Sequence, residues 1–238
     1  VLFEVNNVQK NKGGKYMHYG KLIKGRIELG DKLNVSIDVE RRRAISRAHS
    51  ATHLLQSALR LVLGDHVHQA GSLVEPDHLR FDFTHFSALT PDEIGQVNTV
   101  MADMVLEGAD IETKVMSYDE AKYLGAMALF GEKYGDTVRV VKMGDFSTEL
   151  CGGTHLDNTA KVGMFVITSE GSVASGVRRI EAITGREVIA KYISMSGMLN
   201  RVADRLKARP VEIMTKVENN LSEIHDLKQN IDKLKDQL

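Results

Sequence analysis

The sequence His49-Ser50-Ala51-Thr52-His53 lies in the middle of a segment, residues 44–63, whose apolar residues recur at the spacing of a helix. We therefore predict a helix there that ends at Gly64-Asp65. Its buried stripe would consist of Ala51, Leu54, Leu55, Ala58, Leu59 and Val62. Because His49 and His53 are four residues apart, they share one face of that helix, and this spacing lets two imidazoles bind one metal ion.

A second segment, Cys151-Gly152-Gly153-Thr154-His155, contains the one cysteine of the sequence. The thiol of Cys151 and the imidazole of His155 are four positions apart, and the two glycines between them allow the backbone to turn tightly around an ion. Zinc in proteins takes four ligands, commonly from Cys and His. The sequence therefore predicts a zinc (Zn2+) site made by His49, His53, Cys151 and His155.

Each half of this predicted site has an ordinary explanation when it is taken alone. Two histidines at helical spacing are more often unrelated than paired on a metal, and a lone cysteine is usually a small buried apolar residue. Ser50 stands where zinc proteases have Glu, which argues against a protease. His66 and His68 are further histidines, but their spacing suits a strand. The coincidence of Cys, Gly-Gly and His favours the metal site.

Six short motifs resemble, in the same order, those of the editing domain of alanyl-tRNA synthetase. They are Ser50–Leu55 (SATHLL), Gln69–Val74 (QAGSLV), Leu79–Phe83 (LRFDF), Ala128–Gly135 (ALFGEKYG), Cys151–His155 (CGGTH) and Arg178–Ala182 (RRIEA). The resemblance covers most of residues 1–190. It implies a zinc-containing domain that binds the acceptor end of tRNA(Ala) and hydrolyses Ser-tRNA(Ala) and Gly-tRNA(Ala).

Such an editing activity answers a physical limit on selection by binding. A pocket for alanine rejects glycine by only about 1–3 kcal/mol and cannot strongly reject serine. A pocket that hydrogen-bonds the serine hydroxyl discriminates better, because alanine would leave buried polar groups unpaired. The resemblance places Gln69 near this pocket, with Thr52 as a weaker catalytic candidate. Four protein ligands would close the zinc site, so we expect the ion to expand its coordination or to position the tRNA end.

Two other functions fit the same residues. One is an RNA-binding module in which zinc is purely structural. The other is an editing domain for another amino acid, since threonyl-tRNA synthetase has a domain with a similar zinc-motif pattern. The chain has no room for a synthetase active site, so we expect no ATP-dependent charging of tRNA.

The composition of the 238 residues, 42% hydrophobic and 26% charged, is that of a protein that can bury a sizeable core. One cysteine excludes a disulfide scaffold and predicts a reducing, cytoplasmic location, and no apolar run reaches the about 20 residues of a membrane span. The net charge is −1, yet residues 1–48 contain eleven Lys or Arg against five Asp or Glu. We expect Arg41, Arg42, Arg43, Arg178 and Arg179 to contact tRNA; the alternative is a solvated basic face.

Turn residues and capping patterns predict an α+β fold in three parts. Residues 1–40 have the pattern of a small β-barrel-like module with strands at 2–5, 16–23 and 33–39. Residues 41–187 would form the zinc-containing editing domain, with helices on one face of a largely antiparallel sheet. Its strands are expected at 67–74, 78–85, 138–143, 163–170 and 177–184, and its capped helices from Thr90 to 107 and from Ser117 to 129.

Residues 188–238 would be helical, with a break before Pro210. Beyond the proline, apolar residues alternate spacings of four and three, at Ile213, Val217, Ile224, Leu227, Ile231, Leu234 and Leu238, with Asn220 as a polar position in the same series. β-Branched residues at the a positions and Leu at d favour a parallel two-stranded coiled coil, which predicts a homodimer through this helix. A helix that packs on its own domain would show the same stripe.

Overall fold

The structure is a computed structural model that describes residues 1–128 and 134–237. The chain divides into two compact units, Val1–Asp38 and Val39–Leu238. It combines helices with antiparallel sheets, which confirms the α+β class. The finer division of the chain at residues 40 and 187 stays a prediction.

The first unit is a two-stranded antiparallel sheet. β1 (Leu2–Lys10) pairs with β2 (Tyr16–Lys24). Asn11 holds the turn between them, since its Oδ1 accepts hydrogen bonds from the backbone N–H groups of Gly13 and Lys15, both at 3.0 Å. Where the sequence led us to expect a small barrel-like module, residues 1–38 form a two-stranded ribbon and no closed barrel.

The third strand expected at residues 33–39 does not form. Residues 31–38 adopt neither strand nor helix. Alternating β-branched residues favour an extended chain, but a strand also needs a neighbour with which to pair, and Val35 remains 79% exposed. The helix α1 (Val39–Leu63) then begins five residues before the predicted start at 44. The residues Glu40 to Arg43 are good helix formers, which explains the extension.

α1 is the central element of the second unit and buries the stripe that its sequence predicted. Five of those residues are fully buried and Val62 packs partly buried against them; the five are Ala51, Leu54, Leu55, Ala58 and Leu59. Phe81 and Phe83, on a neighbouring strand, belong to the same buried core cluster as these α1 residues. The burial of these apolar side chains fixes the rotation of α1 about its axis, and so fixes the direction in which its polar face points.

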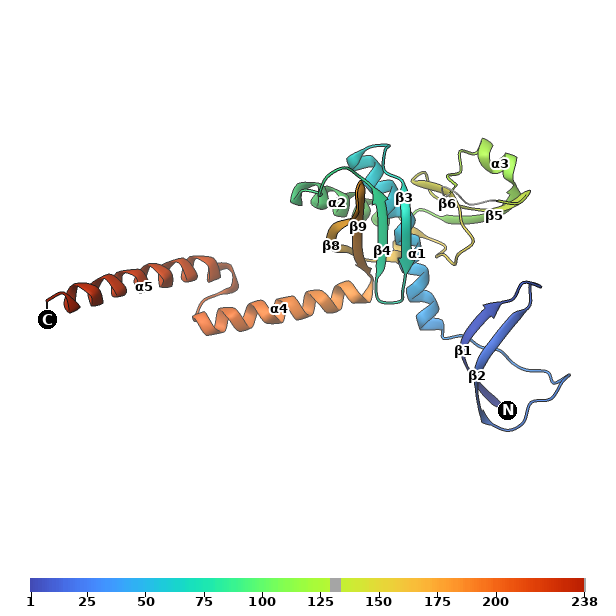
Figure 1. Ribbon diagram of the computed structural model, residues 1–238, viewed down its shortest axis with the longest axis horizontal. Helices are drawn as coiled ribbons and strands as arrows, with labels where there is room; N and C mark the ends of the chain where they lie inside the picture. Colours follow the sequence, from blue (N-terminus) through green and yellow to red (C-terminus); the bar gives the residue numbers. More distant parts are fainter. Residues whose placement is uncertain (129–133, 238) are drawn as a thin grey trace. The chain divides into compact units, whose positions relative to one another are not determined.

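A four-stranded antiparallel sheet supplies those phenylalanines (Figure 1). Its order is β3 (Gln69–Val74), β4 (Leu79–Thr84), β9 (Val177–Thr184) and β8 (Phe165–Ala174). The helices α1 and α2 (Pro91–Glu107) pack on each other and on this sheet, so they cover the same face. Helices on one face of an antiparallel sheet are what the sequence predicted.

Both predicted capping boxes are present. At the start of α2 the Thr90 side chain accepts a hydrogen bond from the Glu93 backbone N–H, and the Glu93 carboxylate accepts one from the Thr90 backbone N–H. Ser117 and Glu120 make the same exchange at the start of α3 (Tyr118–Tyr123). α3 ends six residues before 129, the predicted end of this helix, and Leu129 itself lies outside the described residues.

A second sheet, in the order β5-β6-β7, contains two strands that the sequence did not predict. β5 (Ile111–Ser117) and β7 (Ser147–Leu150) flank β6 (Thr137–Met143), where the sequence predicted a strand. This sheet contacts α1 through β7 and the residues beside it, since the Ser57 hydroxyl donates to the carbonyl oxygen of Phe146 at 2.8 Å. β7 leads directly into Cys151, so it carries the Cys-Gly-Gly-Thr-His segment to α1. A short 3-10 helix, η1 (Thr159–Val162), follows that segment.

The last part of the second unit is helical. α4 (Arg186–Leu206) is followed by the short turn η2 (Pro210–Glu212) and by α5 (Ile213–Lys235), so the break before Pro210 is confirmed. The structure buries no residue of α5. Among the described residues, no helix combines the length and the apolar character that crossing a membrane requires.

Candidate metal centre

The four predicted ligands meet at one point of the second unit. α1 contributes His49 and His53, and the segment after β7 contributes Cys151 and His155. Their ligand atoms all lie within 4.8 Å of one another. The imidazole Nε2 atoms of His49 and His155 lie 3.5 Å and 3.3 Å from the Cys151 sulfur. Residues a hundred positions apart in the sequence therefore form a single donor cluster.

The backbone after β7 is held in place by Arg139 on β6. One guanidinium nitrogen, Nη1, donates to the carbonyl oxygens of Cys151 at 2.7 Å and Gly153 at 2.6 Å. The Cys151 N–H in turn donates to the Arg139 carbonyl oxygen at 3.0 Å. A Cβ atom on Gly153 would lie 2.0 Å from Cε1 of His49, so only glycine permits this close approach.

Polar neighbours orient two of the imidazoles. The Nδ1 of His53 lies 2.7 Å from the carboxylate Oε2 of Glu149, a close contact although its angle is poor for a hydrogen bond. The Ser147 hydroxyl donates to the other oxygen of Glu149 at 2.7 Å. The Nδ1 of His155 lies 3.4 Å from the hydroxyl oxygen of Ser50. Metal-binding histidines commonly direct their second ring nitrogen at such groups, which leaves Nε2 for the ion.

The cluster also favours the charge state that binds a metal. Burial opposes ionisation of Cys151, but hydrogen bonds from the three histidines, that of His155 first, outweigh burial and lower the pKa of the thiol to about 3. The sulfur is therefore a thiolate at neutral pH, which is the metal-binding form. Burial would lower the pKa of His53, but Cys151 and Glu149 beside it raise that pKa to about 9. Binding of a metal to His53 therefore displaces a proton.

The chemistry of the donors fits zinc. Three imidazole nitrogens and one thiolate, converging from two segments, are a common tetrahedral set for this ion. Sequence spacing predicted all four residues, and the structure brings all four together. The other histidines lie apart from the set: the Nε2 of His66 is 2.8 Å from the Nδ1 of His85, and His68 is exposed before β3.

The arginines predicted to contact tRNA fall into two groups. Arg42 and Arg43, in the first two turns of α1, line a cavity of about 770 Å³ that His155 also lines. Arg41 lies 3.8 Å from the carboxylate of Glu75. The basic start of α1 thus shares a cavity with one of the four metal-binding candidates.

Arg178 and Arg179 on β9 are engaged in ion pairs of the sheet. Arg178 binds Glu170 through two nitrogens at 2.6 Å and 2.7 Å. Arg179 binds Asp82, its cross-strand neighbour, at 2.7 Å and 2.8 Å. These bonds largely neutralise both guanidinium charges, so a role of these two residues in tRNA binding remains only a prediction.

The two catalytic candidates occupy different environments. Gln69 is the first residue of β3, and its Nε2 donates to the Ser72 hydroxyl at 3.2 Å. Thr52 is buried in α1, where its hydroxyl donates to the Ala48 carbonyl oxygen at 2.9 Å. Neither residue belongs to the donor cluster, and a catalytic role stays a prediction for both.

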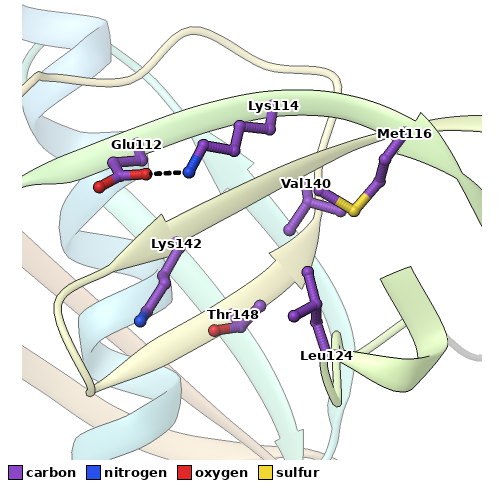
Figure 2. Close-up of a pocket in the computed structure, with 7 residues that line it drawn as sticks. All are labelled: Glu112, Lys114, Met116, Leu124, Val140, Lys142 and Thr148. Carbon is purple, nitrogen blue, oxygen red and sulfur yellow. Dashed lines mark ion pairs between the residues drawn. The ribbon is translucent and has the colours of Figure 1, made fainter. Parts of the chain in front are cut away.

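A separate pocket of about 340 Å³ lies on the three-stranded sheet (Figure 2). Met116, Leu124 and Val140 form its apolar part, and Glu112 makes an ion pair with Lys114 at its edge. None of the four metal-binding candidates lines this pocket. The donor cluster and the cavity beside His155 therefore form the candidate site, and this pocket does not belong to it.

Three residues of the site went unpredicted: Ser50, Arg139 and Glu149. For Glu149 the sequence contained a signal, because it stands two positions before Cys151, and side chains two positions apart in an extended chain point to the same side. Because the strand β7 was not predicted from the sequence, Glu149 was not predicted either. Nothing local in the sequence marks Arg139, whose partners are backbone carbonyl groups of another segment.

Comparison with known proteins places this scaffold in one class. Residues 138–181, which include β7 and the Cys-Gly-Gly-Thr-His segment, match the family described as the threonyl and alanyl tRNA synthetase second additional domain. This part of the chain is thus similar to a class of domain described for these two synthetases.

Curated relatives then narrow the class. Over 99% of its length the chain is 49% identical to an alanine–tRNA ligase of Acetivibrio thermocellus and 50% identical to alanine–tRNA ligase 1 of Lachnoclostridium phytofermentans. A Clostridioides difficile alanine–tRNA ligase is 49% identical over 96% of the chain. Over nearly its whole length the chain is therefore similar to one part of these alanine–tRNA ligases, and the predicted resemblance to the editing domain of alanyl-tRNA synthetase is confirmed. It spans 27% of the length of each of these three relatives.

Proposed function

We propose that this chain hydrolyses the ester bond that joins serine, or more weakly glycine, to tRNA(Ala), and that zinc is its metal. The observation that carries this proposal is the four-residue donor cluster, within 4.8 Å, joined through His155 to a cavity with a basic wall. An aminoacyl-tRNA needs both features, since its phosphates are anionic and its ester must be held still at one place.

The reaction requires only water as a second substrate. Water adds to the ester carbonyl carbon, the bond from that carbon to the ribose oxygen breaks, and tRNA leaves with a free hydroxyl while the amino acid leaves as a carboxylate. Bound zinc would supply positive charge beside the terminal ribose and fasten the Cys151 segment to α1. Arg139, Glu149 and Ser50 keep the ligands in place, because each contacts the Cys151 segment or one of the imidazoles.

Discrimination against alanine calls for a polar group that receives the serine hydroxyl. Gln69 is a suitable residue, because it is partly buried at the start of β3 and its amide can both donate and accept. The Thr52 hydroxyl donates to Ala48, and its oxygen keeps lone pairs that can accept. A substitution of Gln69 is expected to change the rate or the selectivity while zinc is retained.

A second candidate function is RNA binding without chemistry, with zinc as a structural ion. Four protein donors favour it, because structural zinc sites are usually closed whereas catalytic ones keep an open position. A third is editing for threonyl-tRNA synthetase, whose second additional domain shares the matched family description. The identities of 49% and 50% to alanine–tRNA ligases argue for the alanine system.

Deacylation of a panel of substrates separates these functions. The panel is Ser-tRNA(Ala), Gly-tRNA(Ala), Ala-tRNA(Ala) and Ser-tRNA(Thr), each assayed with the zinc-loaded chain at low salt. The proposal predicts fast, slower, negligible and negligible hydrolysis in that order. Preference for Ser-tRNA(Thr) would support the threonyl system, and binding of all four without hydrolysis would support the binding module.

A further inference from the structure

The cavity beside His155 is rich in positive charge. It measures about 770 Å³ and is lined by four cationic side chains but one carboxylate. The cationic residues are Arg42, Arg43, Arg47 and Lys161, and the carboxylate is Asp157. They come from two segments, because α1 supplies the arginines while Lys161 belongs to η1. The cavity is therefore assembled by the same two regions that bring the metal-binding candidates together.

Only part of that charge is neutralised by the protein itself. Lys161 pairs with Asp157 at 2.7 Å, and Arg43 pairs with Glu40 at 3.2 Å. Arg42 and Arg47, in contrast, make no ion pair with any carboxylate in the described parts of the chain. Arg42 is exposed to solvent, whereas Arg47 is partly withdrawn from water, where a cation is costly unless an anion balances it.

Arg47 is the more confined of these two arginines, because its side chain is only partly exposed. Its side chain lies against Gly185: a Cβ atom there would come within 3.2 Å of the Arg47 Nε. The contact keeps the guanidinium group at the cavity wall rather than in open solvent. Ile111 and Leu156, which also line the cavity, add apolar surface to it. A mixed wall of this kind suits a ligand that alternates phosphates with sugars.

We infer that this cavity binds phosphodiester groups of the 3′-terminal nucleotides of an RNA, with Arg42 and Arg47 as the main ligands. The inference rests on the proposed function, to which it adds the place where the nucleic acid is held. An RNA is favoured over another anion because His155 lines the same cavity, so a phosphate bound by these arginines lies next to the donor cluster where the ester must react. Lys161 and Arg43 add to the attraction although each already has a partner.

The test compares a double variant, Arg42→Gln with Arg47→Gln, with a matched control, Arg201→Gln, which changes an exposed arginine of α4. Two measurements are made on the full zinc-loaded chain. Fluorescence anisotropy follows binding of a short single-stranded RNA with a free 3′ hydroxyl, and steady-state kinetics follow hydrolysis of Ser-tRNA(Ala) at several salt concentrations. Zinc content and the unfolding temperature show that each variant is folded.

The double variant should bind the RNA at least about tenfold more weakly and raise KM by a similar factor, with kcat nearly unchanged. In a plot of log KM against log salt concentration, the slope for the double variant should be smaller by about 0.7 for each lost phosphate contact. The variant Arg47→Lys, which keeps the charge, should recover part of the loss, and Arg201→Gln should behave as the unchanged chain.

Each other outcome has a defined meaning. Unchanged RNA binding and KM in the double variant would overturn the inference while leaving the proposed function in place. If the unchanged chain did not hydrolyse Ser-tRNA(Ala), yet the double variant lost RNA binding, the proposed function would fall and the RNA site would stand. A loss of inorganic phosphate binding alone, measured by calorimetry, with RNA binding intact, would assign the cavity to a free anion and would also overturn the inference.

Discussion

The carboxylate Oε2 of Glu149 lies 2.7 Å from Nδ1 of His53, and both side chains are buried. This contact directs Nε2 of the imidazole toward the cysteine and the other histidines. A buried carboxylate in that position also stabilises a metal-bound imidazole, because it raises the basicity of the ligand.

Glu149→Gln should therefore weaken zinc binding by about 10- to 100-fold, the usual cost of losing such a partner. The change keeps the size of the side chain but removes its charge. Competition with a chromophoric chelator at fixed pH measures the affinity. The same change on the surface of α5, Glu218→Gln, serves as the control. Equal affinities for the two variants would mean that Glu149 does not support the metal site.

The two neighbouring glycines of the Cys151 segment give a matched pair of substitutions. A Cβ atom at Gly153 would lie 2.0 Å from the His49 ring, whereas a Cβ atom at Gly152 would meet nothing within 4 Å. Gly153→Ala should displace His49 and lower zinc affinity by at least about tenfold. Gly152→Ala should leave zinc content and affinity unchanged. Similar losses in both variants would show that the segment needs flexibility rather than the close approach seen here.

The ion pair between Asp82 and Arg179 predicts a dependence of stability on pH. Two hydrogen bonds from Arg179 hold the pKa of the Asp82 carboxyl below its ordinary value. A carboxyl group whose pKa is lowered by folding stabilises the protein above its unfolded pKa of about 3.9, and this contribution is lost as the pH falls through the lower folded value. Asp82→Asn should cost about 2 kcal/mol of unfolding free energy at pH 7, between the values for exposed and buried pairs.

Chemical unfolding at several pH values tests this expectation. The difference in unfolding free energy between the unchanged chain and Asp82→Asn should shrink below about pH 4, because the carboxyl of the unchanged chain becomes protonated there. Asp103→Asn, on the exposed side of α2, should show no such trend. A difference that stayed constant down to pH 2 would argue that the two side chains contribute through shape alone.

The apolar stripe of α5 predicts self-association. Ile224, Leu227, Ile231 and Leu234 are between 48% and 60% exposed, as coiled-coil positions are before a partner covers them. Leu238, the last residue of the predicted apolar series, lies outside the described residues. Sedimentation should give a dimer for the full chain and a monomer for a chain that ends at Arg209. Equal monomer masses at tens of micromolar would leave α5 as a packing or connecting helix.

The donor set could be predicted from the sequence because both of its halves depend on local spacing. A helix places residues four apart on one face, and Cys151 and His155 flank two glycines in a turn. The capping boxes at Thr90 and Ser117 are local in the same sense, and both were predicted correctly. Patterns that depend on neighbours in sequence are therefore reliable in this chain.

What the sequence did not predict depends on partners that are distant in sequence. β5 and β7 pair with β6, and their own residues do not form a distinct apolar alternation. Conversely, residues 33–39 have that alternation but find no strand with which to pair. Arg178 and Arg179 looked like free basic residues, since nothing local indicates that Glu170 and Asp82 face them across the sheet.

Hydrolysis of Ser-tRNA(Ala) by the zinc-loaded chain, measured beside Ala-tRNA(Ala) and beside the variant Cys151→Ala, tests the central claim most directly. Replacing Cys151 removes the one thiolate from the donor cluster, so hydrolysis should fall to the spontaneous rate. The unchanged chain should hydrolyse Ser-tRNA(Ala) well above that rate at low salt and spare Ala-tRNA(Ala). An unchanged chain that leaves Ser-tRNA(Ala) intact, or a Cys151→Ala variant with full activity, would contradict it.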